Sequence, residues 1–371
     1  MSDKEQKSPK SPGFMGLGAN IWGGVTNVTG NILSASANVI GGVASMATDS
    51  VDMLNSEKIQ QKEEERIQKV ELIIEQIKTL TAAKSLTKVQ NYTNFNELSL
   101  NTWSNCSAET FSCRVGPNYQ WSGNKEPSST SLYECVGVDW IKSEYRVDDI
   151  PSKVKIPDDF IDNKYDKSAG LPPLLVVNIQ VPSDNNLAIF AECMDGAGYS
   201  LVFYFKITQQ TMEYAKDLST APPSVALLAQ YCNEAPEMDK DLNSEWRGRF
   251  KAIIRCENIE IFNFPPLITG YNSKPVLIKQ TGTLTRGENN SYVIMDINGH
   301  RFNNFSKGAL QQIMKSFDDI ISSFAFCIES RTDEEMPECI FGCATIHKPS
   351  LNGGIEIKIP ANTTSTSNHI A

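Results

Sequence analysis

The N-terminal region contains a long segment that has no charged residue and yet is not continuously apolar. Between Gly13 and Thr48 there is no Asp, Glu, Lys or Arg, and residues 16–48 read as three loose copies of an eleven-residue unit. Eleven residues make almost three helical turns, so this repeat keeps an apolar stripe nearly straight along a helix. A straight, uncharged stripe needs a flat and soft apolar surface to fold against, and a membrane interface is such a surface.

On a helical wheel, the large apolar side chains of this segment fall on one side and its asparagines gather on the other. Because each Gly disfavours a helix by roughly 1 kcal/mol relative to Ala, we expect the helix to form only when its apolar side is buried. The pattern is similar to that of amphipathic lipid-packing sensors, and it predicts that residues 13–54 insert apolar side chains into a membrane surface. The expected membrane-binding residues are Phe14, Leu17, Ile21, Trp22, Val25, Val28, Ile32, Leu33, Val39, Ile40 and Val43.

Three other interpretations of residues 13–54 stay open. A transmembrane span is opposed by the four asparagines and the many glycines of the segment. The segment could also pack as a helix in the core of the globular part, or be a disordered leader.

Composition argues against some function classes. The 371-residue chain has a formal net charge of −10 and contains no basic stripe, so we expect no nucleic-acid partner. Its nine cysteines are irregularly spaced, without a CxxC pair, and the chain does not open with a secretory signal pattern. These features predict reduced thiols in a cytoplasmic protein, and the N-terminal repeat predicts that it associates peripherally with a membrane.

The charged stretch after the repeat predicts a long helix over residues 56–84. Ser56 is a suitable N-cap, and Ile67, Val70 and Ile74 follow at helical spacing. The apolar seam spans too few heptads for a coiled coil, so we expect one helix that docks on the globular domain.

From about residue 100 the sequence changes to short β-branched runs separated by turn signals. Strands in succession with a few helices predict an α+β fold, with a mostly antiparallel sheet and packed helices. The predicted domain covers residues 100–359, and disordered tails are expected at 1–12 and 360–371. The expected strands are 174–181, 187–193, 199–206, 251–257, 274–280, 283–287, 291–297, 324–329, 339–346 and 354–359, and the expected helices are 211–217, 222–232 and 306–322.

Several blocks of this domain occur in the order and spacing of a known family. They begin with Phe111-Ser-Cys-Arg114 and Gly116-Pro-Asn-Tyr119, continue through Trp246-Arg-Gly-Arg-Phe-Lys251, and end with Glu334-Glu-Met-Pro-Glu338. The chain resembles the C-terminal domain of the plant enhanced disease resistance proteins, a domain of unknown function. The motif residues that we single out are Asn178, Pro182, Asp296, Glu335, Pro337 and Glu338.

The resemblance implies little about activity. The plant proteins carry a pleckstrin-homology domain and a lipid-binding START domain upstream, and the residues that precede the domain here are too few to hold either. The stretch Asp296-Ile-Asn-Gly-His-Arg301 also departs from the Gly-Ser-Ser pattern of the plant proteins. The resemblance therefore implies only a domain that accompanies membrane and lipid modules in signalling or trafficking proteins.

The acidic block at the end of the motif is a candidate for acid–base chemistry. Glu334, Glu335 and Glu338 could act as acid and base if burial separated their pKa values. Because Pro337 interrupts them, we expect instead a turn whose carboxylates accept backbone N–H bonds.

The sequence also gives little support for a metal site or a cofactor site. The sequence that starts at Asp296 has its glycine too early for a calcium loop. Cys339, Cys343 and His347 share one face of an expected strand, which ordinary packing explains as well as zinc does. We therefore expect no metal, no cofactor and no enzyme activity.

Five cations form a candidate pocket for a lipid head group, and the alternative is that they are solvated charges at sheet edges. They are Arg114, Lys142, Arg247, Arg249 and Lys251. A second set, four tryptophans, is expected to anchor the core rather than to stack on a ligand. They are Trp103, Trp121, Trp140 and Trp246.

Together these features predict a non-enzymatic peripheral membrane protein that associates with lipid in signalling or trafficking. The expected partners are a membrane lipid surface and a lipid ligand, and the sequence identifies no protein partner. The alternative is a protein-interaction scaffold whose N-terminal apolar stripe docks on a partner or on its own domain.

Overall fold

The structure is a computed structural model that describes residues 45–90, 92–161, 165–166, 170–183, 195–235, 244–246 and 248–358, with the backbone alone for residues 45–59. The tails predicted at 1–12 and 360–371 lie outside the described residues. So do all eleven expected membrane-binding side chains and the strand predicted at 187–193. In the described part, no helix is both long and apolar enough to cross a membrane.

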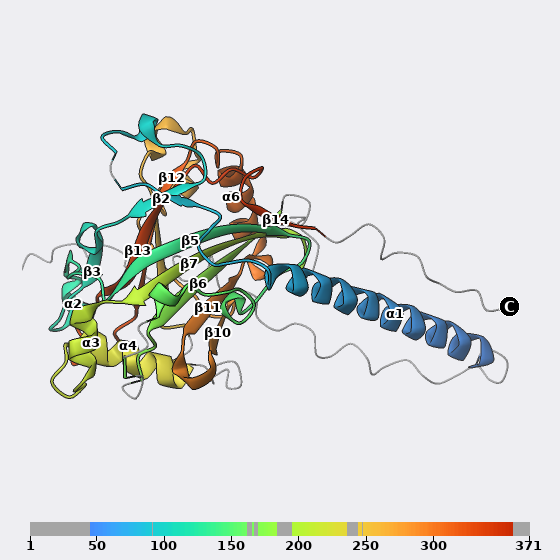
Figure 1. Ribbon diagram of the computed structural model, residues 1–371, viewed down its shortest axis with the longest axis horizontal. Helices are drawn as coiled ribbons and strands as arrows, with labels where there is room; N and C mark the ends of the chain where they lie inside the picture. The colour runs from blue at the N-terminus through green and yellow to red at the C-terminus, as the bar shows by residue number, and fades with distance from the viewer. Residues whose placement is uncertain are drawn as a thin grey trace, which may run out of the picture.

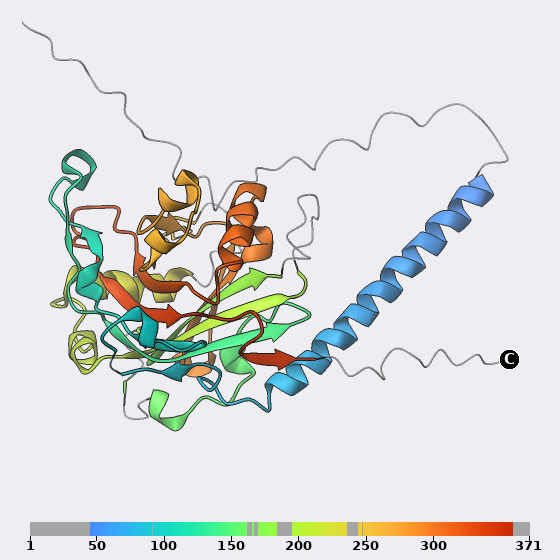
Figure 2. The same ribbon diagram turned by 90° about the horizontal axis from the view of Figure 1, so that it is seen from above.

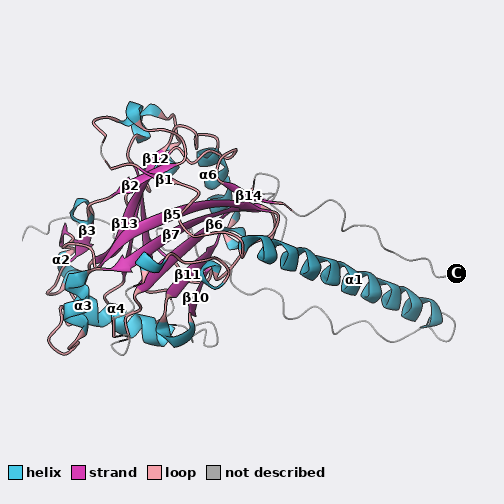
Figure 3. Ribbon diagram, viewed as in Figure 1, coloured by secondary structure: helices cyan, strands magenta, loops and turns pink. Residues whose placement is uncertain are grey.

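The described strands form two six-stranded sheets and one small hairpin (Figures 1 and 3). One sheet has the order β1 (Thr87–Lys88), β2 (Thr102–Asn105), β13 (Ile340–His347), β12 (Ile321–Ile328), β8 (Phe250–Cys256), β9 (Pro275–Leu277). The other has the order β10 (Gly282–Arg286), β11 (Val293–Asn298), β6 (Leu174–Pro182), β7 (Gly198–Ile207), β5 (Tyr133–Ser143), β14 (Ile355–Ile357). The hairpin pairs β3 (Ser112–Arg114) with β4 (Lys125–Pro127).

Most strand pairs are antiparallel, and the α+β class with mostly antiparallel pairing is confirmed. The exceptions are β1 with β2, β11 with β6, and β14 with β5, which pair in parallel. The described strands divide into two sheets that pack face to face.

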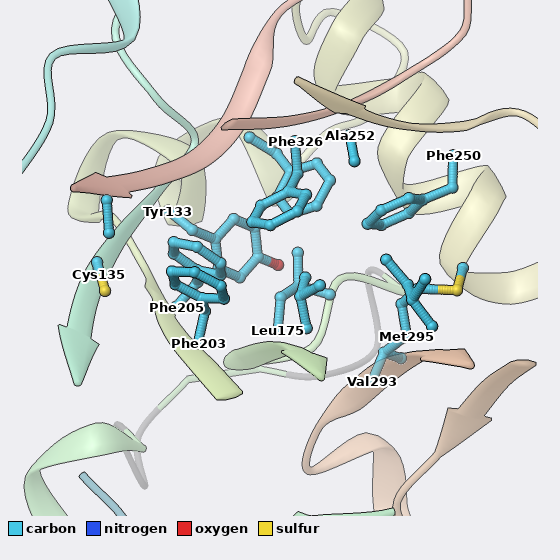
Figure 4. Packing of buried hydrophobic residues seen from close by; sticks show 14 of the residues in the cluster. Tyr133, Cys135, Leu175, Phe203, Phe205, Phe250, Ala252, Val293, Met295 and Phe326 are labelled. Carbon is cyan, nitrogen blue, oxygen red and sulfur yellow. The ribbon is translucent and has the colours of Figure 1, made fainter. Parts of the chain in front are cut away.

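Aromatic side chains fill the space between the two sheets (Figure 4). Phe203 and Phe205 of β7 lie 5.6 and 5.9 Å, between ring centroids, from Phe326 of β12. Phe341 of β13 lies 6.3 Å from Phe205 in an edge-on arrangement. Such pairs stabilise a core beyond the area that they bury, and here they join strands of both sheets.

The helices and short 3-10 turns surround this sandwich. The helices are α1 (Ser45–Ile77), α2 (Tyr119–Ser122), α3 (Gln209–Ala215), α4 (Pro223–Glu234), α5 (Pro266–Thr269) and α6 (Asn304–Met314). The 3-10 turns include η2 (Ala108–Thr110), η3 (Ile150–Ser152), η8 (Ile259–Ile261) and η10 (Gly299–Arg301).

Helix α1 projects from the body, and its C-terminal part lies against it (Figures 1 and 2). Ile73 and Ile77 are buried against the outer face of the β5–β7–β6 sheet, whereas Ile67 is 47% exposed. The predicted helix is correct in kind but wrong at both ends, because Ser56 lies inside α1 and the helix ends at Ile77.

The early end of α1 has a local cause at Asp139, a buried residue of β5. Its carboxylate accepts the N–H groups of Ala83 at 2.6 Å, Lys84 at 3.0 Å and Ser85 at 2.9 Å. The chain can turn there because Ala83 adopts a left-handed φ of 60°. If the helix continued through residue 84, these hydrogen bonds would be lost. They hold residues 83–85, which follow the helix, on the sheet.

Two other expectations need correction. The helix predicted at 306–322 ends at Met314, and strand β12 already begins at Ile321. Strand β5 was not expected at all. A β-bulge between Cys135 and Gly137 interrupts it, and a Cβ atom at Gly137 would lie 2.0 Å from that of Ala83.

Candidate functional site

An apolar cavity of about 220 Å³ lies between the two sheets, where α5 and α6 close one end of the sandwich. Leu201 and Ile297 line it from one sheet, and Phe324 and Ile346 line it from the other. Helices α5 and α6 and the residues next to them complete the wall with Phe264, Leu267, Ile268, Phe305, Ala309, Leu310, Ile313 and Phe317.

Strand and helix periodicity explain why these residues meet. Along β8, Ala252 and Ile254 point into the cavity while Lys251 and Ile253 point to the opposite face of the sheet, as the two-residue repeat of a strand requires. Along α6, Phe305, Ala309 and Ile313 recur every four residues and so share one side of the helix. The N-terminus of α6 is held by the Asn303 side chain, which accepts the Ser306 N–H at 2.8 Å.

The mouth of the cavity is bordered by exposed apolar side chains. Leu267 of α5 is 49% exposed and Phe305 of α6 is 42% exposed, and both also line the cavity. The exposed Lys274 stands among the lining residues, with its ammonium 5.5 Å from the ring centroid of Tyr271. The opening thus presents an apolar surface with a cation beside it.

The lining offers little reactive chemistry. Of the residues that form the cavity wall, none is a His, Asp or Glu. Burial raises the pKa of the Cys256 thiol to about 11, so it stays protonated at neutral pH. The Asn272 side chain is engaged with the Cys256 backbone, accepting its N–H at 2.7 Å and donating to its carbonyl at 3.2 Å. The cavity therefore suits an apolar ligand held by burial alone.

Three of the five predicted head-group cations do come together, but each is paired with a carboxylate. Glu338 Oε1 accepts hydrogen bonds from Arg114 Nε at 2.8 Å, Lys251 Nζ at 2.6 Å and the Ser330 N–H at 3.0 Å. Arg249 Nη1 donates to Glu335 at 2.8 Å. This cluster lies on the opposite side of β8 from the cavity.

The acidic block at residues 334–338 forms a turn whose carboxylates accept backbone N–H bonds, as expected. Glu335 accepts the Arg331 N–H at 2.5 Å. Burial opposes ionisation of Glu335, but the hydrogen bonds from the Arg331 N–H and from Arg249 lower its pKa overall. Glu338 thus joins the turn to β3 and β8, and the cluster has the contacts of a structural anchor.

The remaining head-group candidates lie elsewhere. Lys142 of β5 pairs with Glu356 of β14 at 3.1 Å, in the other sheet. Arg247 is outside the described residues. Among the residues that the structure describes, no group of three or more His, Cys, Asp or Glu is arranged to hold a metal ion.

The family-motif residues Asn178 and Asp296 form a buried pair on neighbouring strands β6 and β11. They stand opposite each other, and Asn178 Nδ2 donates to Asp296 Oδ1 at 2.7 Å. Burial, with Asp148 nearby, raises the pKa of Asp296 to about 7. Pro182 ends β6, and Pro337 lies in the acidic turn.

Trp103, Trp140 and Trp246 are buried, as expected of core anchors. Trp121 is not, because it lies on the single-turn helix α2 and is 90% exposed. Together with Arg331 and Asp333 it lines a polar surface depression of about 460 Å³.

Sequence analysis singled out none of the cavity-lining side chains as functional, and it expected Trp140 to be a core anchor. The helical repeat of Phe305, Ala309 and Ile313 was the available signal. It shows that one side of α6 is apolar, but not that space is left beneath it.

Comparison with known proteins gives one positive result. The family model described as Protein ENHANCED DISEASE RESISTANCE 2, C-terminal, matches residues 103–349, which is more than half of the chain. No curated protein and no solved structure matches the chain.

Proposed function

The chain belongs to the family of the C-terminal domain of Protein ENHANCED DISEASE RESISTANCE 2, and from this premise we propose that it is a peripheral membrane protein that binds lipid without enzymatic activity. Its place of action in this proposal is the cytoplasmic surface of a membrane, in lipid signalling or trafficking.

The observation that carries the proposal is the apolar cavity with its apolar mouth. Its volume of about 220 Å³ is below the roughly 300–1,000 Å³ typical of sites for drug-sized ligands. It therefore suits one slim aliphatic chain rather than a lipid with two chains. Exposed Leu267 and Phe305 at the mouth favour contact with a lipid surface, from which such a chain would enter.

Acyl-chain binding can be tested with the full-length protein and a fluorescent fatty acid. Ala309→Phe places a ring in the cavity, and we expect it to weaken binding at least about tenfold because the ring occupies the space of the chain. Gln311→Phe is the matched control, because Gln311 is exposed on the same helix and does not line the cavity. Equal binding by both variants would exclude the cavity as the site.

Membrane attachment by the N-terminal segment is a separate part of the proposal. Deleting residues 1–44 leaves α1, which begins at Ser45. We expect the full chain to float with small, loosely packed neutral vesicles and the deleted chain to stay at the bottom of the gradient, because the repeat inserts without charge. Failure of the full chain to float would refute this part.

The alternative proposal is a protein-interaction scaffold, and the exposed apolar mouth supports it too. The N-terminal stripe could cover Leu267 and Phe305 instead of meeting a membrane. In that case residues 13–44 of the purified protein would resist proteolysis without lipid, and Leu267→Asp would make them sensitive.

A further inference from the structure

Two cysteines that are far apart in sequence face each other at the end of a strand pair. β2 and β13 are antiparallel, with Asn105 opposite Ala344 as the last pair of the ladder. One further step along the same register places Cys106 opposite Cys343. The Cys343 thiol donates a hydrogen bond to the Cys106 carbonyl oxygen over 3.0 Å.

This geometry is compatible with a disulfide. Residues directly opposite in an antiparallel ladder have Cα atoms about 4.5–5.5 Å apart, and a disulfide spans Cα distances of about 4.4–6.8 Å. Cys343 is buried, whereas Cys106 is only half-buried. A small oxidant can therefore reach the Cys106 sulfur first.

The surroundings of Cys106 favour its thiolate. The neighbouring Cys343 thiol lowers the pKa of Cys106 most, burial opposes this effect, and the Thr345 and Ser323 hydroxyls and the positive charge of Arg255 also lower the pKa. The Ser323 and Thr345 hydroxyls are 2.8 Å apart on neighbouring strands. The pKa of Cys343 is raised, because its interaction with Cys106 and its burial both favour the protonated thiol.

Other thiols of the described part lack this combination. Cys135 and Cys232 are buried, and burial raises the pKa of each to about 12. Cys256 is half-buried like Cys106, but burial raises its pKa to about 11. Cys256 is therefore a matched control for exposure without activation.

We propose that Cys106 is a peroxide-reactive modification site and that Cys343 is its disulfide partner. The Cys106 thiolate attacks one oxygen of a hydroperoxide, the O–O bond breaks, and the leaving oxygen takes a proton to give water or an alcohol. Cys106 becomes a sulfenic acid. The Cys343 sulfur then attacks the Cys106 sulfur, its proton and the displaced hydroxide form water, and the S–S bond results. Two thiols have lost two electrons to the peroxide.

The test uses reduced full-length protein at pH 7 and limiting hydrogen peroxide. Free thiols are then blocked with iodoacetamide, and the peptides are mapped without reduction. We expect the first cross-linked product to join the peptides of Cys106 and Cys343, two hydrogens lighter than their sum. Cys106 should be consumed at least about tenfold faster than Cys256, in proportion to its larger thiolate fraction.

Variants separate the two steps. Cys343→Ser should leave a sulfenic acid on Cys106 that dimedone traps, and Cys106→Ser should abolish the linkage while Cys256→Ser keeps it. The proposal is overturned if Cys106 reacts no faster than Cys256, or if other cysteines form the first disulfide. The wild-type measurement decides this even where a variant fails to fold.

Discussion

Two buried carboxylates on the same face of the β5–β7–β6–β11 sheet show how local donors decide the role of a side chain. Asp139 accepts three backbone N–H groups and the Ser85 hydroxyl. From the residues that the structure describes, Asp296 accepts the Asp149 N–H at 3.0 Å and the Asn178 amide, and Asp148 lies near it. Asp139 therefore holds residues 83–85 on the sheet, whereas Asp296 is a buried acid with few hydrogen-bond donors to stabilise its charge.

The raised pKa of Asp296 predicts a pH-dependent stability. The folded-state pKa of about 7 lies above the unfolded value of 3.8, so the native state binds more protons between these values. The stabilising contribution is complete below about pH 4 and is lost as the pH rises through 7. Relative to Asp296→Asn, we expect wild type to lose on the order of 3 kcal/mol of unfolding free energy between pH 5 and pH 8.

Urea denaturation of both proteins at the two pH values measures this difference. Comparing wild type with the variant cancels His300 and His347, whose pKa values are lowered to about 4 by burial and act in the opposite sense. A wild-type-minus-variant difference that does not change with pH would contradict a native Asp296 that titrates near 7.

At the scale of elements, the C-terminal end of α1 is docked on the body, while the rest of the helix projects away from it. Burial of Ile73 and Ile77 fixes the last turns on the sheet, whereas the Ile67 side chain is 47% exposed. A helix that is polar on most sides depends on its ion pairs and on its docked end for stability. Arg66 contributes to both, since it pairs with Glu63 on the helix and with Asp195 on the body.

We expect Ile77→Ala to destabilise the protein by about 2–5 kcal/mol, because it leaves a cavity under the docked turn. Ile67→Ala is the matched control on the same helix and should leave stability unchanged, since its side chain is largely exposed. Urea denaturation gives both values, and hydrogen exchange along α1 shows whether the docked turn opens. Equal effects of the two substitutions would mean that the end of α1 is not docked.

Most strands could be predicted because β-branched runs bounded by turn residues mark them locally. β6 and β7 were found within one residue at each end. β5 escaped because Gly137 and Asp139 interrupt its apolar pattern, and both depend on the distant Ala83. The cavity could not be predicted, because the space between two sheets depends on how the sheets pack against each other. The residue pattern of each strand does not determine that packing.

At the scale of the whole molecule, Glu338 connects three distant parts of the chain. Its carboxylate joins Arg114 of the β3–β4 hairpin, Lys251 of β8 and the Ser330 backbone. The two cations and the carboxylate are largely buried, so each depends on the others for compensation. The sequence identified these residues but not their pairing, because charge sign alone does not distinguish a binding pocket from an ion-pair cluster.

Glu338→Gln should destabilise the protein by about 1.5–3 kcal/mol, because it removes charged hydrogen bonds to two buried cations and leaves them the more distant carboxylate of Glu329, 3.5 Å from Arg114 and 3.9 Å from Lys251. Thermal denaturation measures the loss. Glu334→Gln in the same turn should leave the midpoint unchanged, since Glu334 is exposed. A midpoint for Glu338→Gln equal to that of wild type would show that the cluster is solvated and not a structural anchor.

Helix α1 has 33 residues and is therefore about 50 Å long. Because its C-terminal part lies against the body, whatever holds Ser45 also confines the domain to a shell of that radius. The cavity mouth is then always close to the surface that holds Ser45. Its effective concentration at that surface is on the order of millimolar. The mouth then needs only weak intrinsic affinity to meet that surface repeatedly, and each encounter can end without the protein leaving its anchor.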